Sequence, residues 1–154
     1  MSIPLIARIR TRLYGVKSDL LRQYYNRIWG THIERGVRLS LTAKLDKTNP
    51  KGIHIGEYTI VTFRTSILTH DFVNRRHMDV HIGSHCFIGC GTIIMPGVRI
   101  GNHCIIGAGT VVKDDIPDNS VVVGVPGRII ESGIETIEWG MRPIRQDETG
   151  YVQP

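Results

Sequence analysis

The sequence predicts an all-β protein wound as a parallel β-helix. Between residues 82 and 112, isoleucine or valine recurs at every sixth position: Ile82, Ile88, Ile94, Ile100, Ile106 and Val112. The position two residues earlier always holds a small or β-branched residue, and glycines recur between the aliphatic positions. A period of six fits neither a helix nor one alternating strand. It fits short strands joined by tight turns, with three hexads to a triangular coil and aliphatic side chains buried between coils.

Weaker hexads extend this pattern toward the N-terminus. Ile33, Leu39 and Leu45 are in register, and after the turn TNPKG the register resumes at Ile55, Val61 and Ile67. The next aliphatic position, Ile82, follows after fifteen residues, which we interpret as two hexads plus three residues and therefore as a loop directly after His70. A second three-residue excess separates Val112 from Val121 and predicts an excursion at 114–119. Residues 31–130 thus form a β-helix domain of about five coils.

The two flanking segments have different patterns. Residues 1–30 space apolar side chains three or four apart among arginines and lysines, as expected for an amphipathic helical arm, which Gly15 and Ser18 divide if it is two helices. Such an arm either covers the open end of the β-helix or lies on an anionic membrane surface as a weak contact. In residues 131–154, Ser132 and Glu135 fit a capping box that opens a short helix, followed by a polar tail.

Composition is that of one ordinary globular domain. The chain has 154 residues, 41% hydrophobic and 21% charged, and its net charge of +5 is concentrated in residues 1–38. No nucleic-acid recognition motif accompanies the basic residues, so we expect no nucleic-acid partner. We find neither a run of eighteen apolar residues nor a signal-peptide pattern, and we expect a cytoplasmic protein. Cys86 and Cys104, one coil apart, should stack in the core as reduced thiols.

The segment IGSHCFIGCGTIIMPGVRIGNHCIIGAGTVVKDDIPDNSVVVGVPGRII, from Ile82 to Ile130, and the upstream LTHDF resemble the hexapeptide-repeat acyltransferases. The pattern is similar to that of galactoside and maltose acetyltransferases and of O-acetyltransferases of polysaccharide biosynthesis. This resemblance implies a left-handed β-helix, a homotrimer, and acetyl-coenzyme A (acetyl-CoA) as donor, with no metal required. It also implies transfer to a hydroxyl of a sugar or of a polysaccharide or lipopolysaccharide precursor, either a small molecule or a lipid-linked saccharide.

His70 is the predicted general base. An acyl transfer to a hydroxyl needs a group that removes the hydroxyl proton, and histidine titrates near neutrality. His70 stands where the register breaks, and it occupies the position of the family's catalytic histidine. Charged and polar residues on or near the following loop are candidates for acceptor binding, unless they are simply solvated loop residues: Asp71, Arg64, Arg75, Arg76 and His77.

Small residues at the turns are the predicted contacts of the donor. In the family, the pantetheine arm follows the backbone of successive coils in a groove between protomers, which corresponds here to Gly89, Cys90, Gly107, Ala108, Gly124 and Pro126. By the same resemblance, Lys113 and Arg128 meet the nucleotide phosphates. The chain reads GAGTVVKDD where relatives commonly read GAGSVVTKD, which moves the lysine by one position.

Three other interpretations remain open. His81, His85 and His103 suggest a metal site, because γ-class carbonic anhydrases bind zinc on this fold, although their histidine spacing is different. Serine O-acetylation is a rival activity, but in that group the repeats follow a long helical domain that this sequence does not show. A β-helix without catalytic activity, acting as a scaffold or binding module, is the third interpretation.

Overall fold

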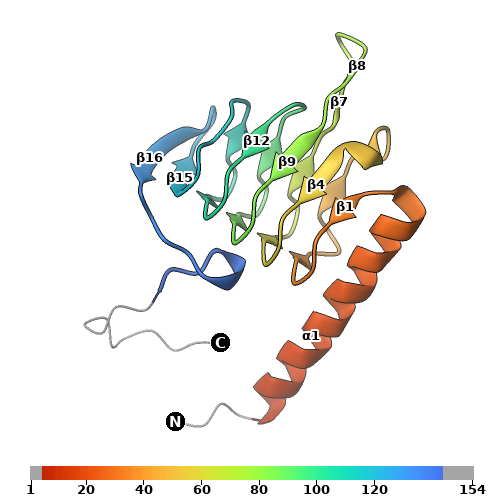
Figure 1. Cartoon of the computed structure of the whole chain (residues 1–154), viewed down its shortest axis with the longest axis vertical. Coiled ribbons are helices and arrows are strands. Elements are labelled where there is room, and N and C mark those ends of the chain that lie inside the picture. Colours follow the sequence, from red (N-terminus) through yellow and green to blue (C-terminus); the bar gives the residue numbers. More distant parts are fainter. Residues whose placement is uncertain (1–4, 144–154) are drawn as a thin grey trace.

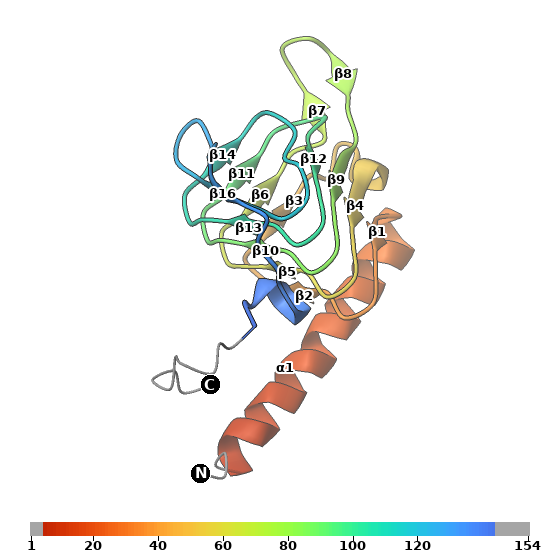
Figure 2. The same cartoon turned by 60° about the vertical axis from the view of Figure 1, so that its left-hand side comes forward.

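The computed structural model describes residues 5–143, with side chains from residue 13 onward, and shows a left-handed parallel β-helix (Figures 1 and 2). Short strands form three sheets that run along the stack. The first sheet contains β1 (His32–Ile33), β4 (Ile53–Ile55), β9 (Val80–Ile82) and β12 (Arg99–Ile100). The second contains β2 (Arg38–Leu39), β5 (Ile60–Val61), β10 (Phe87–Ile88), β13 (Ile105–Ile106) and β15 (Ser120–Val123). The third contains β3 (Lys44–Leu45), β6 (Ser66–Ile67), β11 (Ile93–Ile94) and β14 (Val111–Val112).

The register confirms the hexad prediction. Apart from β16 (Arg128–Ser132), which joins the edge of the second sheet, the strands of these sheets pair in parallel. Val61, Ile88 and Ile106 therefore lie above one another in the second sheet. All the aliphatic positions predicted to point inward are buried, and so are their small partners two residues earlier. Several of those partners are threonines whose hydroxyls donate to a glycine carbonyl of the next coil, as Thr59 does to Gly83 and Thr92 to Gly107. These threonines therefore keep their polar atoms satisfied inside the core.

The two cysteines of the core behave as predicted. Cys86 and Cys104 are both fully buried and both are free thiols. They occupy equivalent positions in neighbouring coils, and the backbone N–H of Cys104 lies 3.4 Å from the sulfur of Cys86. Each thiol also donates to a backbone carbonyl, Cys86 to Gly101 at 3.1 Å and Cys104 to Pro117 at 3.2 Å. They serve as small core side chains.

The first predicted excursion, the loop after His70, is longer than the three extra residues predicted from the sequence. Ile82 pairs with Ile55 on one side and with Ile100 on the other, so all three lie in the first sheet. Because Ile67 lies in the third sheet, Ile82 is only one hexad further along the coil. The segment between them therefore contains nine extra residues rather than three.

The prediction of a second excursion, at 114–119, is wrong. Ile116 takes the position above Ile100, and Val122 takes the position above Ile106. The last coil is thus two residues shorter than a regular one, and no residues loop out of it. Val122 rather than Val121 joins the central core cluster as a result.

The N-terminal arm is one continuous helix, α1 (Leu5–Tyr24), followed by a π-helical turn at Tyr25–Trp29. Gly15 does not interrupt it, and residues 1–4 lie outside the described part. Leu21 and Tyr25 pack against the core at the first coil. Asn26 covers the edge strand β1: its side-chain amide donates to the carbonyl of Ile33, and its side-chain oxygen accepts from the N–H of Ile33. Among residues 5–143, no helix has the length and apolar character needed to cross a membrane.

The C-terminal helix predicted from Ser132 is not formed there. Ser132 ends β16 (Arg128–Ser132), which pairs antiparallel with β15, and the following segment runs back along one corner of the coils. There the N–H of Ile134 donates to Asn119, and the N–H of Trp139 donates to Tyr58, three coils away. These backbone hydrogen bonds, and not a capping box of Ser132 and Glu135, determine the course of the segment. The only helical turn of the segment within the described residues is the 3₁₀ turn Glu138–Gly140, and residues 144–154 of the predicted tail lie outside the described part.

Candidate active site

The candidate site lies at the corner where the chain passes from the third sheet to the first. In the first coil this corner carries an inserted turn that includes the 3₁₀ helix Pro50–Gly52, and in the second coil it carries the nine extra residues. Those residues form a hairpin of β7 (His70–Asp71) and β8 (Arg76–His77), which projects from the stack (Figure 1). Because successive coils stack in register, the two insertions lie next to one another.

His70 is held by a carboxylate from the first coil. Its Nδ1 forms a short hydrogen bond with Oδ2 of Asp46. The backbone N–H of Thr69 donates to the same oxygen at 2.9 Å, and the N–H of Thr48 donates to the other oxygen at 2.9 Å. The Asp46 side chain is only 4% exposed, whereas the His70 side chain is 29% exposed. The carboxylate is thus buried behind the ring, and the ring reaches the surface.

The charge of Asp46 is stabilised by these contacts. Burial by itself raises the pKa of Asp46, but the hydrogen bonds from His70, Thr48 and Thr69 outweigh it and lower the pKa to about 2. An ionised carboxylate only accepts hydrogen bonds, so Nδ1 of His70 carries the proton. In the neutral ring, Nε2 then has a free lone pair, which is the state that a general base needs.

Asp46 was missed by the sequence analysis. It belongs to the coil before that of His70, and the TNPKG turn lengthens this coil beyond three hexads. The available signal was the coil register, since Leu45 pairs with Ile67 and thereby places the next residue, Asp46, beside the segment that ends at His70. A carboxylate at that point was the feature to look for.

A cleft of about 520 Å³ opens in front of His70. It is lined by the hairpin and by one residue of the inserted turn: Thr48, His70, Asp71, Phe72, Val73, Arg75, Arg76 and His77. Four of the five predicted acceptor residues, Asp71, Arg75, Arg76 and His77, are therefore gathered here. Phe72 and Val73 at the hairpin tip are 85% and 86% exposed. The cleft offers cationic, hydrogen-bonding and aromatic groups near the imidazole of His70, and His77 contributes a second imidazole.

Asp71 shapes the hairpin rather than pairing with His70. Its carboxylate accepts from the backbone N–H of Asn74 at 3.0 Å and from the Asn74 side chain at 2.6 Å. These two bonds lower the pKa of Asp71. Arg64, the remaining predicted acceptor residue, precedes β6, whereas His70 follows it. Arg64 therefore lies at the opposite end of that strand and does not line the cleft.

The predicted donor contacts lie mainly at the other corner of the third sheet. Gly89 and Cys90 precede β11, Gly107 and Ala108 precede β14, and Gly124 and Pro126 form the turn between β15 and β16. Cys90 is half-buried and Ala108 is exposed. A side chain at Gly89 would lie 2.6 Å from the backbone nitrogen of Ala108, so the stacking of coils already requires glycine at that position.

The two predicted phosphate contacts are separated. Arg128 begins β16, beside the turn that contains Gly124 and Pro126. Lys113 directly follows β14 and therefore lies at the His70 side of the third sheet, two coils further along. Its ammonium group pairs with Asp114 at 2.8 Å. Within one protomer, Lys113 is thus on the same sheet edge as His70, and the other donor contacts are not.

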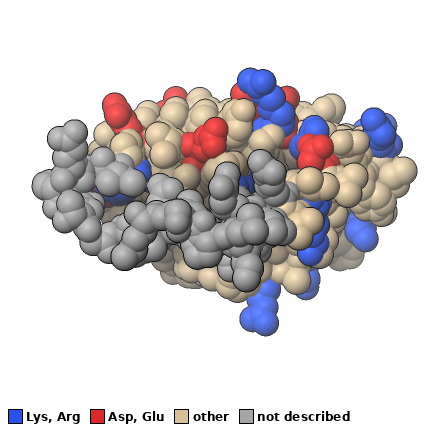
Figure 3. All heavy atoms as spheres, turned by 90° about the horizontal axis from the view of Figure 1, so that it is seen from below, with Lys and Arg blue, Asp and Glu red and all other residues tan. Residues whose placement is uncertain are grey.

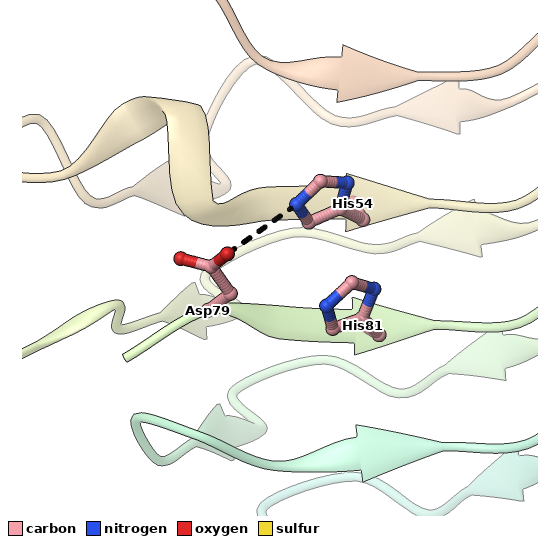
Figure 4. Close-up of side chains that lie close together, drawn as sticks. All are labelled: His54, Asp79 and His81. Atoms are coloured by element: carbon pink, nitrogen blue, oxygen red, sulfur yellow. Dashed lines mark ion pairs between the residues drawn. The ribbon is translucent and has the colours of Figure 1, made fainter. Parts of the chain in front are cut away.

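The histidines suggested as a metal site do not come together. His85 stacks on His103 with ring centroids 5.1 Å apart, and His81 stacks instead on His54 at 4.2 Å. Among the described residues, the group with metal-ligand spacing is His54, Asp79 and His81, whose ligand atoms lie within 4.8 Å of one another (Figure 4).

The His54, Asp79 and His81 group is built as a stack. The rings of His54 and His81 are 8° from parallel, so their nitrogens do not point at a common centre. Burial is the main cause that lowers the pKa of both histidines, and the Arg99 guanidinium on the next coil lowers that of His81 further. A metal ion here would require both rings to turn and would lie beside a cation.

Comparison with known proteins places this geometry in a family. Residues 79–114 match the family model of the bacterial transferase hexapeptide (six repeats). YvoF of Bacillus subtilis, named as an acetyltransferase, is 34% identical over 122 residues, which are 78% of this chain and 69% of YvoF. Protein CapG of Staphylococcus aureus is 39% identical over 65% of this chain and 63% of CapG.

A solved structure agrees in fold. The maltose O-acetyltransferase of Clostridium difficile 630 superposes with a TM-score of 0.52 at 26% identity, covering 76% of this chain and 87% of that protein. The sequence similarity to YvoF extends over most of both chains, and the repeats and the coils agree with the resemblance seen in the sequence. The chain therefore belongs to the hexapeptide-repeat transferase family, and it is an acetyltransferase.

Proposed function

We propose that this protein transfers the acetyl group of acetyl-CoA to a hydroxyl of a saccharide, with His70 as the general base. The single observation that carries the proposal is the His70–Asp46 pair at the mouth of the cleft. A buried carboxylate that fixes one ring nitrogen and leaves the other facing a cleft is the arrangement used to activate a hydroxyl. The similarity to a maltose O-acetyltransferase supports a sugar as the acceptor.

The proposed reaction needs one base and no covalent enzyme intermediate. Nε2 of His70 takes the proton of the acceptor hydroxyl as its oxygen attacks the acetyl carbonyl, and Asp46 stabilises the imidazolium that forms. Backbone N–H groups hold the negative charge that develops on the carbonyl oxygen. The C–S bond then breaks, and the coenzyme A thiolate leaves with the proton from His70. Cys90 acts through its backbone and is not a nucleophile.

The cleft suits a saccharide acceptor. Arg75, Arg76 and His77 line it and offer donors to sugar hydroxyls or to a sugar phosphate. Phe72, on the exposed tip, offers an apolar ring against which the carbon face of a sugar can lie. Asp71 is already bonded to Asn74, so we assign it the role of shaping the hairpin.

A trimer explains how base and donor meet. His70 lies at one edge of the third sheet, and Cys90, Ala108 and Pro126 lie at the other. One face of the prism holds about six residues of extended chain, roughly 20 Å. We propose that a neighbouring protomer brings its small-residue corner against His70, so that the thioester lies in the groove between two copies.

The test is release of free thiol from acetyl-CoA in the presence of a panel of sugars and of serine. We expect release with a sugar and none with serine. His70→Ala should lower turnover about 10²- to 10⁴-fold while acetyl-CoA still binds. His32→Ala is the matched control, because His32 is an exposed histidine of the first sheet outside the cleft, and it should retain full turnover. Use of serine, or near-normal turnover by His70→Ala, would contradict the proposal.

A further inference from the structure

The helical arm, made of α1 and the turn Tyr25–Trp29, has one broad apolar sector, and the coils cover only one edge of it. Ser18 is buried, and Leu21 and Tyr25 pack against the first coil. A second row of large apolar side chains, spaced three or four apart, is between 48% and 67% exposed: Leu13, Val16, Leu20, Tyr24 and Ile28. We call this row the outer stripe. Large apolar side chains of a helix are normally covered by the domain on which the helix packs, so the exposed outer stripe needs another explanation.

The described part of the chain does not cover the outer stripe. Figures 1 and 2 both show the first half of α1 running past the coils, away from the β-helix. The C-terminal segment, which does return across the coils, contacts the corner at Tyr58 and Gly36 through Trp139. In the sequence, the same spacing continues toward the N-terminus at Ile6 and Ile9.

The charges around the outer stripe are almost all positive. Residues 5–29 contain six basic residues and one acidic residue, Asp19. Asp19 is bonded by Arg22 and Gln23, so its charge is matched within the helix. Lys17 is exposed and lies four residues after Leu13 and three before Leu20, hence on the same face. In the view from below, lysine and arginine side chains are visible in the middle and on the right of the molecule (Figure 3).

We propose that the outer stripe seats α1 on the surface of an anionic phospholipid bilayer. The apolar side chains would enter the boundary between headgroups and acyl chains, and the basic side chains would contact lipid phosphates. A second copy of α1 is disfavoured as the occupant, because it would bring six like charges against six. The helix can contact the coils and the membrane at the same time. Leu21 and Tyr25 pack against the first coil, and the outer stripe meets the membrane.

The test is co-sedimentation of the full-length protein with vesicles. We expect binding to phosphatidylcholine vesicles that contain phosphatidylglycerol, little binding to phosphatidylcholine alone, and weaker binding as salt is raised. Leu20→Glu should lower the bound fraction about tenfold, because it places a carboxylate in the stripe. Leu41→Glu is the matched control, since Leu41 is 59% exposed against 62% for Leu20 and lies in the β-helix. It should bind as the wild type does.

Three results would overturn the proposal. The first is absence of binding to anionic vesicles, and the second is equal binding by Leu20→Glu and Leu41→Glu. The third is a lower molecular mass of Leu20→Glu in light scattering, because the stripe would then be covered by another copy of the chain. Thermal unfolding of both variants checks that each is folded, and since the stripe is exposed we expect both to unfold near the wild-type temperature.

Discussion

At the scale of single residues, Asp46 is the side chain on which the site most depends. Its carboxylate fixes the tautomer and the orientation of His70 but does not reach the cleft, so it acts through the histidine. We expect Asp46→Asn to lower kcat about 10- to 100-fold and to leave the KM for acetyl-CoA unchanged. Steady-state kinetics at saturating acceptor would show this. A rise in KM with unchanged kcat would mean that Asp46 serves binding instead.

Asp46 also makes the stability of the fold depend on pH. Its pKa is lowered from 3.8 to about 2 in the folded protein, so ionised Asp46 stabilises the folded state fully above pH 4. That contribution is lost as the pH falls from about 4 to 2 and amounts to roughly 2 kcal/mol. Urea unfolding at pH 5 and pH 2.5 should show a larger loss of stability for the wild type than for Asp46→Asn. Equal losses would contradict the assignment.

The sequence predicts a role for His70 but does not point to Asp46, with which His70 pairs, and the reason is physical. His70 can be picked out as a candidate from its own stretch of sequence, because the register of aliphatic residues breaks directly after it. The partnership with Asp46 depends on how two irregular insertions of 46–52 and 70–79 stack, and no periodicity describes them. The same limitation explains the miscounted hairpin, since the spacing of fifteen from Ile67 to Ile82 fits two hexads plus three residues as well as one hexad plus nine.

At the scale of elements, the regular coils follow from the sequence and the ends do not. Each inward position from Ile33 to Val112 is buried as predicted. The fixed spacing puts these aliphatic side chains on the inside of every coil, where they are removed from water. The C-terminal segment was predicted as a helix because Ser132 and Glu135 have local capping propensity. Backbone bonds to Asn119 and Tyr58, far away in sequence, determine its course instead.

The cap formed by Asn26 offers a test of how the first coil is closed. Its side chain pairs with both the N–H and the carbonyl of Ile33, as a neighbouring strand would, and also accepts from the Thr31 hydroxyl. Asn26→Ala should cost about 2–3 kcal/mol, because it leaves polar groups of the buried Ile33 without partners. Gln23→Ala is the control: its one hydrogen bond is on the exposed side of α1, and we expect a change within about 0.5 kcal/mol.

The midpoint of urea unfolding at a fixed protein concentration measures both variants, since an oligomer's apparent stability depends on concentration. A cost for Asn26→Ala as small as that of Gln23→Ala would show that α1 covers the first coil through apolar packing alone. A drop in the midpoint with retained activity at low temperature would show that the cap stabilises the fold without shaping the cleft.

At the scale of the whole molecule, the separation of His70 from the donor corner makes a prediction about assembly. If each site combines His70 of one protomer with the Ala108 corner of a neighbour, two inactive variants should restore each other's activity. His70→Ala lacks the proposed base, and Ala108→Trp places a bulky group in the predicted donor groove, where Ala108 is exposed. In randomly mixed trimers, half of the histidines and half of the donor corners are intact, so about a quarter of the wild-type activity should return.

The measurement is thiol release by a mixture of the two variants that have been unfolded and refolded together, with the same variants refolded apart and then combined as the control. Recovery only in the first sample would show that the site is shared between copies. If each protomer held a complete site, no mixture of His70→Ala and Ala108→Trp could be active, because every chain would carry one defect. Because the two edges of the third sheet are about a prism face apart, we expect the shared arrangement.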